Sequence, residues 1–163
     1  MASMNALRDG LRTLADELEE DNDAFWRERI APLLPPGPLS PEFLEETLAP
    51  LHGLNRAIVL EFLARLGRAE IADTAARLAA RAGVPGSHAL ELAVALAQCG
   101  DPRGCAALEA LFRRSLRHPD EEGSVPLEWI TEDTLGKRLR TPEALELRRR
   151  LVALANAERS EGN

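Results

Sequence analysis

The clearest structural signal in the chain is LAVALAQCGDPRGCAALEALF, residues 92–112. Two apolar, helix-forming runs are separated here by Gly-Asp-Pro. A glycine such as Gly100 readily adopts the left-handed backbone conformation that closes many helices. Asp101 can accept hydrogen bonds from the first amides of the next helix, and Pro102 suits the first helical position because no amide donor is needed there. The stretch therefore predicts an antiparallel helical hairpin with a tight turn.

The hairpin pattern recurs along the chain. Residues 59–81, shifted by 33 positions, place apolar side chains over apolar side chains and glycine over glycine. A third copy starts at Thr141, 40 positions after Asp101, and its seven additional residues fit the acidic loop at 118–125. Recurrence at this spacing is typical of proteins built from stacked helical units.

The stretch at 92–112 resembles the HEAT-like repeat, in particular the short bacterial form named after the phycobilisome lyases. The resemblance rests on the Gly-Asp-Pro-Arg turn at residues 100–103 and on the spaced leucines around it. It covers mainly residues 54–117, with a degenerate copy at 126–158. The resemblance implies an all-α fold: an α-solenoid of stacked antiparallel helical hairpins, with eight or nine helices and outer surfaces available to bind partners.

The overall composition also predicts a helical fold. The 163 residues include 28 Leu and 26 Ala but only 4 Ile and 5 Val. Leu and Ala favour helices, whereas β-branched residues favour strands. Aromatic residues make up 4% of the chain and tyrosine is absent, so we expect an aliphatic core. No apolar stretch approaches the roughly 20 residues of a membrane helix, so membrane insertion is not expected.

Proline and charge divide the chain into three parts. Residues 1–31 form an acidic helical segment, residues 32–41 a proline-rich joint, and residues 42–159 the HEAT-like repeat domain, expected to be one compact unit. The first part contains either two helices joined by a tight turn or one continuous helix. Two helices are favoured, because Asp21 or Asp23 can cap the second one.

Caps and glycines predict the other helix boundaries. Ser40 and Thr141 are capping residues, and each is followed by a proline suited to the first helical position. Ser87 is expected to cap a further helix. The glycines expected to end successive helices are Gly53, Gly67, Gly83 and Gly100.

Net charge and cysteine content indicate the kind of partner and the cellular compartment to expect. The net charge is −7, and all of the excess lies in residues 1–50, which hold 11 acidic residues and 4 Arg. This distribution of charge argues against nucleic acid as a partner, because phosphate contacts require a clustered cationic surface. Two cysteines and a start without a signal-peptide pattern predict a reduced, cytoplasmic protein.

The sequence contains no spacing typical of a metal site or an active site. His-Glu-x-x-His, Cys-x-x-Cys, Gly-x-Ser-x-Gly and the P-loop are all absent, so no cofactor and no enzymatic activity are expected. Cys105 is directed inward by the apolar spacing around it, where burial disfavours the thiolate. Trp26 and Trp129 each lie in an apolar helical stripe and are expected in the core.

The first candidate for a partner-binding surface is an acidic cluster. Its members are Glu17, Glu19, Glu20, Asp21 and Asp23. Carboxylates at the C-terminal end of a helix are disfavoured by the helix dipole, so a basic surface on another protein would explain them. A structural explanation stays open, since Asp21 or Asp23 can act as a cap and a continuous helix removes most of the cost.

A second candidate surface is the basic group formed by Arg113, Arg114 and Arg117. Arginines late in a helix also complement the helix dipole, so this group has a structural explanation too.

The leading functional hypothesis is a non-enzymatic helical-repeat protein that binds another protein, as an adaptor, a regulator or an immunity-type inhibitor of a basic toxin. One alternative is an enzyme or enzyme subunit similar to the bilin lyases, although such a site needs more aromatic residues than this chain has. The other is a nucleic-acid-binding protein similar to the HEAT-like alkylpurine DNA glycosylases, which would require the arginine groups to align. The oligomeric state does not follow from the sequence.

Overall fold

The computed structural model describes residues 2–81 and 86–161, and every regular element in these ranges is a helix. The longer helices are α1 (Ala2–Glu17), α2 (Asp23–Ile30), α3 (Pro41–Leu48), α4 (Gly53–Arg65), α5 (Ala72–Ala80), α6 (Gly86–Gln98), α7 (Pro102–Arg117), the π-helix η4 (Trp129–Arg138) and α8 (Pro142–Glu161). The short 3-10 helices are η1 (Glu20–Asn22), η2 (Ala31–Leu33) and η3 (Ala69–Ile71). The prediction of an all-α fold is confirmed, and the nine longer helices of the described ranges agree with the expected eight or nine.

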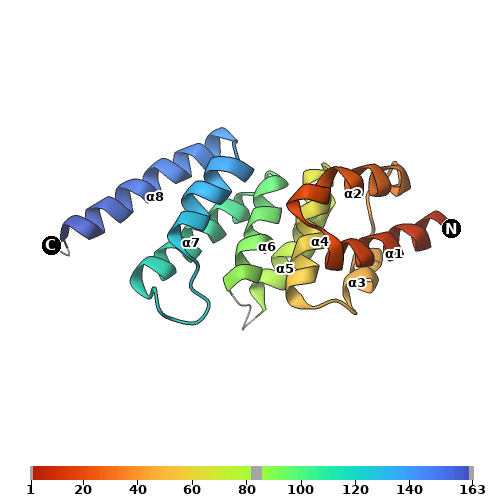
Figure 1. The fold of residues 1–163 in the computed structure, drawn as a ribbon, viewed down its shortest axis with the longest axis horizontal. Coiled ribbons are helices and arrows are strands. Elements are labelled where there is room, and N and C mark those ends of the chain that lie inside the picture. Colours follow the sequence, from red (N-terminus) through yellow and green to blue (C-terminus); the bar gives the residue numbers. More distant parts are fainter. Residues whose placement is uncertain (1, 82–85, 162–163) are drawn as a thin grey trace.

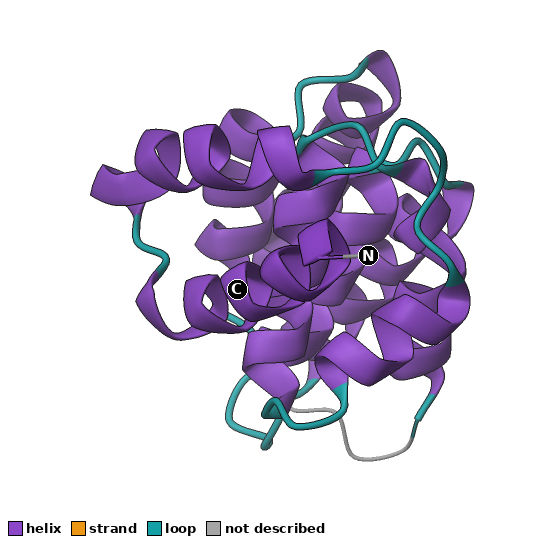
Figure 2. Cartoon of the chain, turned by 90° about the vertical axis from the view of Figure 1, so that its right-hand side faces the viewer, coloured by secondary structure: helices purple, strands orange, loops and turns teal. Residues whose placement is uncertain are grey.

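The helices follow one another along the long axis of the molecule (Figure 1). Helices α1 to α3 lie at one end, α4 to α6 in the middle, and α7, η4 and α8 at the other end, with the two termini far apart. Helix α6 packs against α4 and α5 on one side and against α7 on the other. The end-on view in Figure 2 shows helices joined by loops throughout the described chain.

The apolar interior consists of two clusters that share α6. Leu92 and Leu96 belong to the cluster built from α1 to α6, whereas Leu90 and Val94 belong to the cluster built with α7, η4 and α8. Residues 92 and 96 share one face of a helix, and residues 90 and 94 lie on the opposite one. The side chains of α6 are therefore buried on two sides, and this helix joins the two halves of the molecule.

Most of the predicted capping interactions are present. The Ser40 hydroxyl accepts a hydrogen bond from the Phe43 amide at 3.1 Å, and the Thr141 hydroxyl accepts one from the Ala144 amide at 3.2 Å. The Asp101 carboxylate accepts from the Arg103 amide at 2.9 Å. Gly100 has a φ of 75°, as expected for a left-handed residue that ends a helix. The predicted hairpin turn between α6 and α7 is confirmed.

Several predicted boundaries are wrong or untested. Gly53 starts α4 instead of ending α3, which stops at Leu48. The arginines Arg12 and Arg56 donate to the last carbonyl groups of α3, so the helix ends without a glycine. Ser87 lies inside α6, which begins at Gly86, so it is not the cap. The expected end at Gly83 lies outside the described residues.

The two tryptophans differ in burial. Trp26 is 2% exposed, as predicted, but Trp129 is 47% exposed, so the prediction of a core position for Trp129 is wrong. Trp129 begins η4, in which the Leu139 amide donates to the Thr134 carbonyl, five residues earlier. In this wider, π-helical turn, Ile130, Thr134 and Leu135 lie on the buried face of η4, and Trp129 lies on the exposed face.

Candidate functional site

The acidic candidate cluster lies at the turn between α1 and α2. Two helices are present, as favoured from the sequence, but neither Asp21 nor Asp23 provides the cap. Asn22 holds the turn instead: its side-chain amide donates to the Glu17 carbonyl at 2.7 Å, and its side-chain oxygen accepts from the Glu19 amide at 2.7 Å. An aspartate could not replace it, because a carboxylate only accepts hydrogen bonds.

The five acidic residues of the cluster fall into two groups. Glu17, Glu19, Glu20 and Asp21 are exposed, and no salt bridge involves any of them within residues 2–81 and 86–161. Asp23 is partly buried and forms ion pairs with Arg27 and Arg65, both at 2.7 Å. The four exposed carboxylates are therefore available to a partner, whereas Asp23 connects α2 to α4.

The pair between Asp23 and Arg65 is the start of a longer ionic network. Arg65 also contacts the Glu61 carboxylate at 3.0 Å, and the other oxygen of Glu61 lies 3.0 Å from Arg138. Arg138 in turn donates to both carboxylate oxygens of Glu91, at 3.1 and 2.8 Å. The network joins α2, α4, η4 and α6, which lie in both halves of the molecule.

The network changes the pKa of two of its members. Burial alone would lower the pKa of Arg138, but hydrogen bonds and charge attraction from Glu91 and Glu61 outweigh it and raise the pKa. For Asp23, burial would raise the pKa, but hydrogen bonds from Arg65 and Arg27 outweigh it and lower the pKa below 3.8. Both groups are therefore charged at neutral pH.

A groove of about 790 Å³ lies beside the turn and exposes this network. Three apolar side chains line it: Leu18, Leu54 and Ile58. The carboxylates that line it are Glu19, Glu20, Asp23, Glu61, Glu91 and Asp133, and the basic groups are Arg65, Lys137 and Arg138. Acidic groups thus outnumber basic groups, and the groove combines apolar surface with a negative rim.

Helix α4 supplies much of the groove because its sequence repeats at the right spacing. Leu54, Ile58, Glu61 and Arg65 are separated by four, three and four positions and therefore share one face of the helix. Of the acidic candidates, Glu19, Glu20 and Asp23 line the groove. Glu17 and Asp21 belong to the same turn but do not line it.

The basic candidates lie on α7 and do not line this groove. Arg113 is 3.7 Å from Glu109 on the same helix, and Arg114 donates to the Glu122 carbonyl at 3.0 Å. Arg117 is exposed. The contact of Arg114 with the acidic loop at 118–125 connects that loop to α7.

Neither cysteine has the surroundings of a nucleophile. Burial, with smaller contributions from Asp101 and Glu70, raises the pKa of the Cys99 thiol from 9.0 to about 11. Burial also raises the pKa of Cys105. In the part of the chain that the structure describes, no group of three or more His, Cys, Asp or Glu side chains is arranged to hold a metal ion.

Replacing Asp23 by asparagine is expected to lower the free energy of unfolding at pH 7 by about 1 kcal/mol. The loss is modest because the ion pairs of Asp23 with Arg27 and Arg65 are partly exposed to water. Because its pKa is lowered in the folded state, Asp23 stabilises the protein above its unfolded pKa, and this contribution is lost as pH falls through the folded pKa. Urea unfolding at several pH values should show the difference from wild type shrink below pH 3.8. The exposed Asp9→Asn is the control, and a pH-independent difference would contradict the ion-pair role.

Residues 2–81 and 86–161 contain no helix that is both long enough and apolar enough to cross a bilayer. Comparison of the chain with protein-family models, curated proteins and solved structures gave no match to any of the three.

Proposed function

We propose that this chain is a non-enzymatic, HEAT-like helical-repeat protein that binds a basic segment of another protein in the groove beside the turn between α1 and α2. The observation that carries the proposal is that two exposed carboxylates of the groove, Glu19 and Glu20, form no ion pair with any of the described residues. Carboxylates left without basic neighbours beside a groove are available to a positively charged partner.

The order of helix packing supports the repeat architecture. Helix α6 lies between α4 and α5 on one side and α7 on the other, and it contributes apolar residues to both interior clusters. A helix buried on two sides is what an inner layer of stacked hairpins requires. We therefore infer an α-solenoid in which residues 54–117 form the best-defined repeats.

The lining of the groove indicates the chemistry of the partner. The apolar side chains Leu18, Leu54 and Ile58 offer contacts to one or two apolar anchors. Glu19 and Glu20 add negative charge at one side of the groove that can attract lysine or arginine, whereas Asp133 already pairs with Lys137 at 3.2 Å. An amphipathic segment with basic residues flanking a short apolar stripe matches both properties.

Reversing the charge of Glu17, Glu19 and Glu20 to lysine is expected to weaken binding of an amphipathic Lys/Leu peptide by roughly 10-fold or more while the helical content stays unchanged. Fluorescence anisotropy of the labelled peptide at physiological salt measures the affinity, and circular dichroism measures the fold.

A matched control is available in the loop at 118–125. Reversing Asp120, Glu121 and Glu122 changes the net charge by the same amount but leaves the groove intact. An equal loss of affinity in both triple variants would overturn the groove as the binding site. Pull-down with the wild-type chain and with the Glu17, Glu19 and Glu20 variant then identifies natural partners that depend on the acidic turn.

A further inference from the structure

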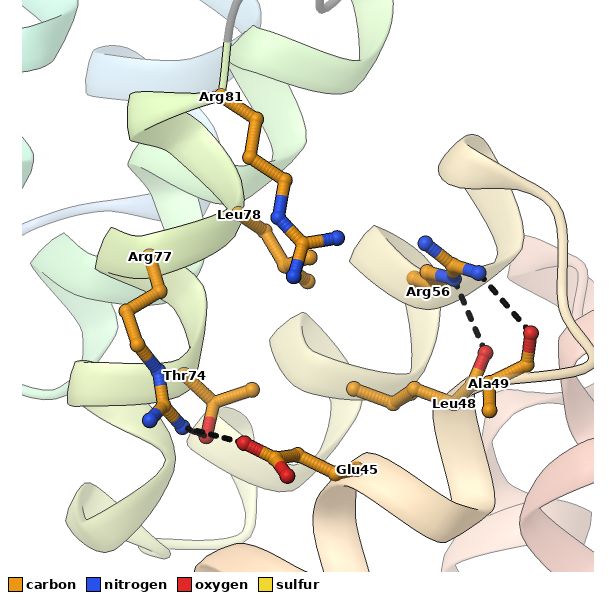
Figure 3. Close-up of a pocket in the computed structure, with 8 residues that line it drawn as sticks. All are labelled: Glu45, Leu48, Ala49, Arg56, Thr74, Arg77, Leu78 and Arg81. Carbon is orange, nitrogen blue, oxygen red and sulfur yellow. Dashed lines mark hydrogen bonds and ion pairs between the residues drawn. The ribbon is translucent and has the colours of Figure 1, made fainter.

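A second, smaller pocket lies between α3, α4 and α5 (Figure 3). Its volume is about 350 Å³, and its polar lining consists of Glu45, Thr74 and three arginines, Arg56, Arg77 and Arg81. Arg56 is two residues from both Leu54 and Ile58, so it projects from the opposite face of α4. This pocket is therefore separate from the acidic groove, and its charge has the opposite sign.

The three arginines have different surroundings. Arg56 donates to the Leu48 carbonyl at 2.9 Å and to the Ala49 carbonyl at 3.0 Å, where it caps α3. Arg77 donates to the Thr74 hydroxyl at 3.2 Å and lies 3.4 Å from Glu45. These two arginines thus have structural partners, although Glu45 and Arg77 are both more than half exposed.

Arg81 differs from the other two in its contacts with the described residues. Its side chain makes no hydrogen bond or salt bridge with any of the described residues. Figure 3 shows its guanidinium group directed into the pocket, toward the space that Arg56 also faces, while Glu45 lies beside Arg77. Two positive groups therefore face the same space without a carboxylate between them.

The pocket carries an excess of positive charge. Three guanidinium groups and one carboxylate line it, which leaves two positive charges uncompensated in a chain of net charge −7. The carbonyl groups at the end of α3 partly compensate Arg56, but they do not contact Arg81. A bound dianion would balance the remaining charge and remove the repulsion between the arginines.

We propose that this pocket binds a phosphate monoester, held by Arg81 and by Arg56, whose Nη1 makes no hydrogen bond with a described residue. Planar guanidinium groups match the oxygen geometry of phosphate and can donate two parallel hydrogen bonds to it. A volume of about 350 Å³ admits a phosphate group with a small part of the molecule that carries it.

Isothermal titration at constant ionic strength tests the proposal with three probes: inorganic phosphate, O-phosphoserine and a short phosphoserine peptide. We expect saturable binding of at least one probe, and a loss of roughly 10-fold or more in affinity for Arg81→Gln. Binding should strengthen between pH 5 and pH 7, because the second phosphate pKa is about 6. Binding of the small probes would indicate a free metabolite, and binding of the peptide alone would indicate a phosphorylated protein.

The control is Arg159→Gln, which removes an exposed arginine of α8 outside the pocket. Neither arginine side chain forms a hydrogen bond or ion pair with the described residues. Both variants should therefore keep the wild-type circular dichroism spectrum. Saturable binding that Arg81→Gln leaves unchanged would overturn the proposal, as would the absence of saturable binding for all three probes. The test does not use the acidic groove, so its outcome is independent of the proposed protein binding.

Discussion

Glu61→Gln is expected to lower the free energy of unfolding by about 3 kcal/mol, one of the two largest effects expected for a single substitution in this chain. The Glu61 side chain is 7% exposed and lies 3.0 Å from both Arg65 and Arg138. Glutamine removes the negative charge that lies between the two guanidinium groups, and its amide NH2 turns a donor toward one of them where a carboxylate oxygen now accepts. Arg65 keeps Asp23 and Arg138 keeps Glu91, so the loss comes from the buried Glu61 position. Equilibrium unfolding in urea, followed by circular dichroism, measures the loss.

Glu132→Gln is the matched control for that substitution. Glu132 also pairs with an arginine, Arg148, at 2.8 Å, but the two side chains are 57% and 37% exposed. An exposed pair contributes about 1 kcal/mol or less, because water solvates both partners when the pair is broken. A loss at Glu61 no greater than the loss at Glu132 would contradict the importance of the buried Glu61 carboxylate.

Gly104→Ala is expected to destabilise the protein by about 3 kcal/mol, although alanine is the better helix former. A Cβ atom at Gly104 would lie 2.2 Å from the Ala97 backbone nitrogen and 2.6 Å from the Ala97 Cα. Backbone atoms cannot rotate away as a flexible side chain can, so α7 must move away from α6 and loosen the packing around it. The melting temperature should fall by roughly 6–12 °C.

The control for this substitution is Gly136→Ala in η4. The nearest atom to a Cβ there is the Thr131 carbonyl oxygen at 3.5 Å, an ordinary contact distance. We expect a change of about 1 kcal/mol or less. A similar small effect of Gly104→Ala would mean that α6 and α7 can separate without loss, which would contradict the close approach of the two helices.

The parts of the fold that could be predicted are those with local causes. The turn between α6 and α7 depends on Gly100, Asp101 and Pro102, three adjacent residues whose conformational preferences all favour the same turn. The π-helix η4 is different, because the spacing of its apolar residues fits an ordinary helix equally well. It packs against α8, a contact that the local sequence does not reveal, and with this wider turn Trp129 is exposed.

The candidate site could be predicted only in part. The acidic turn is visible in the sequence. That Asp23 forms an internal ion pair while the other acidic residues stay exposed depends on Arg65, which lies 42 positions away. Glu61 had a usable signal: a carboxylate within the apolar run VLEFLA is expected to be buried and to need a basic partner. The identity of that partner, Arg138, depends on how η4 packs and could not be read from the pattern.

The double burial of α6 also constrains how the protein could be shortened. A cut on either side of α6 would uncover one of the two apolar surfaces that Leu92 and Val94 now occupy. Neither half would then have a polar surface on that side to shield its apolar side chains from water. Dissection into autonomous fragments would therefore require a new hydrophilic cap designed for the exposed side.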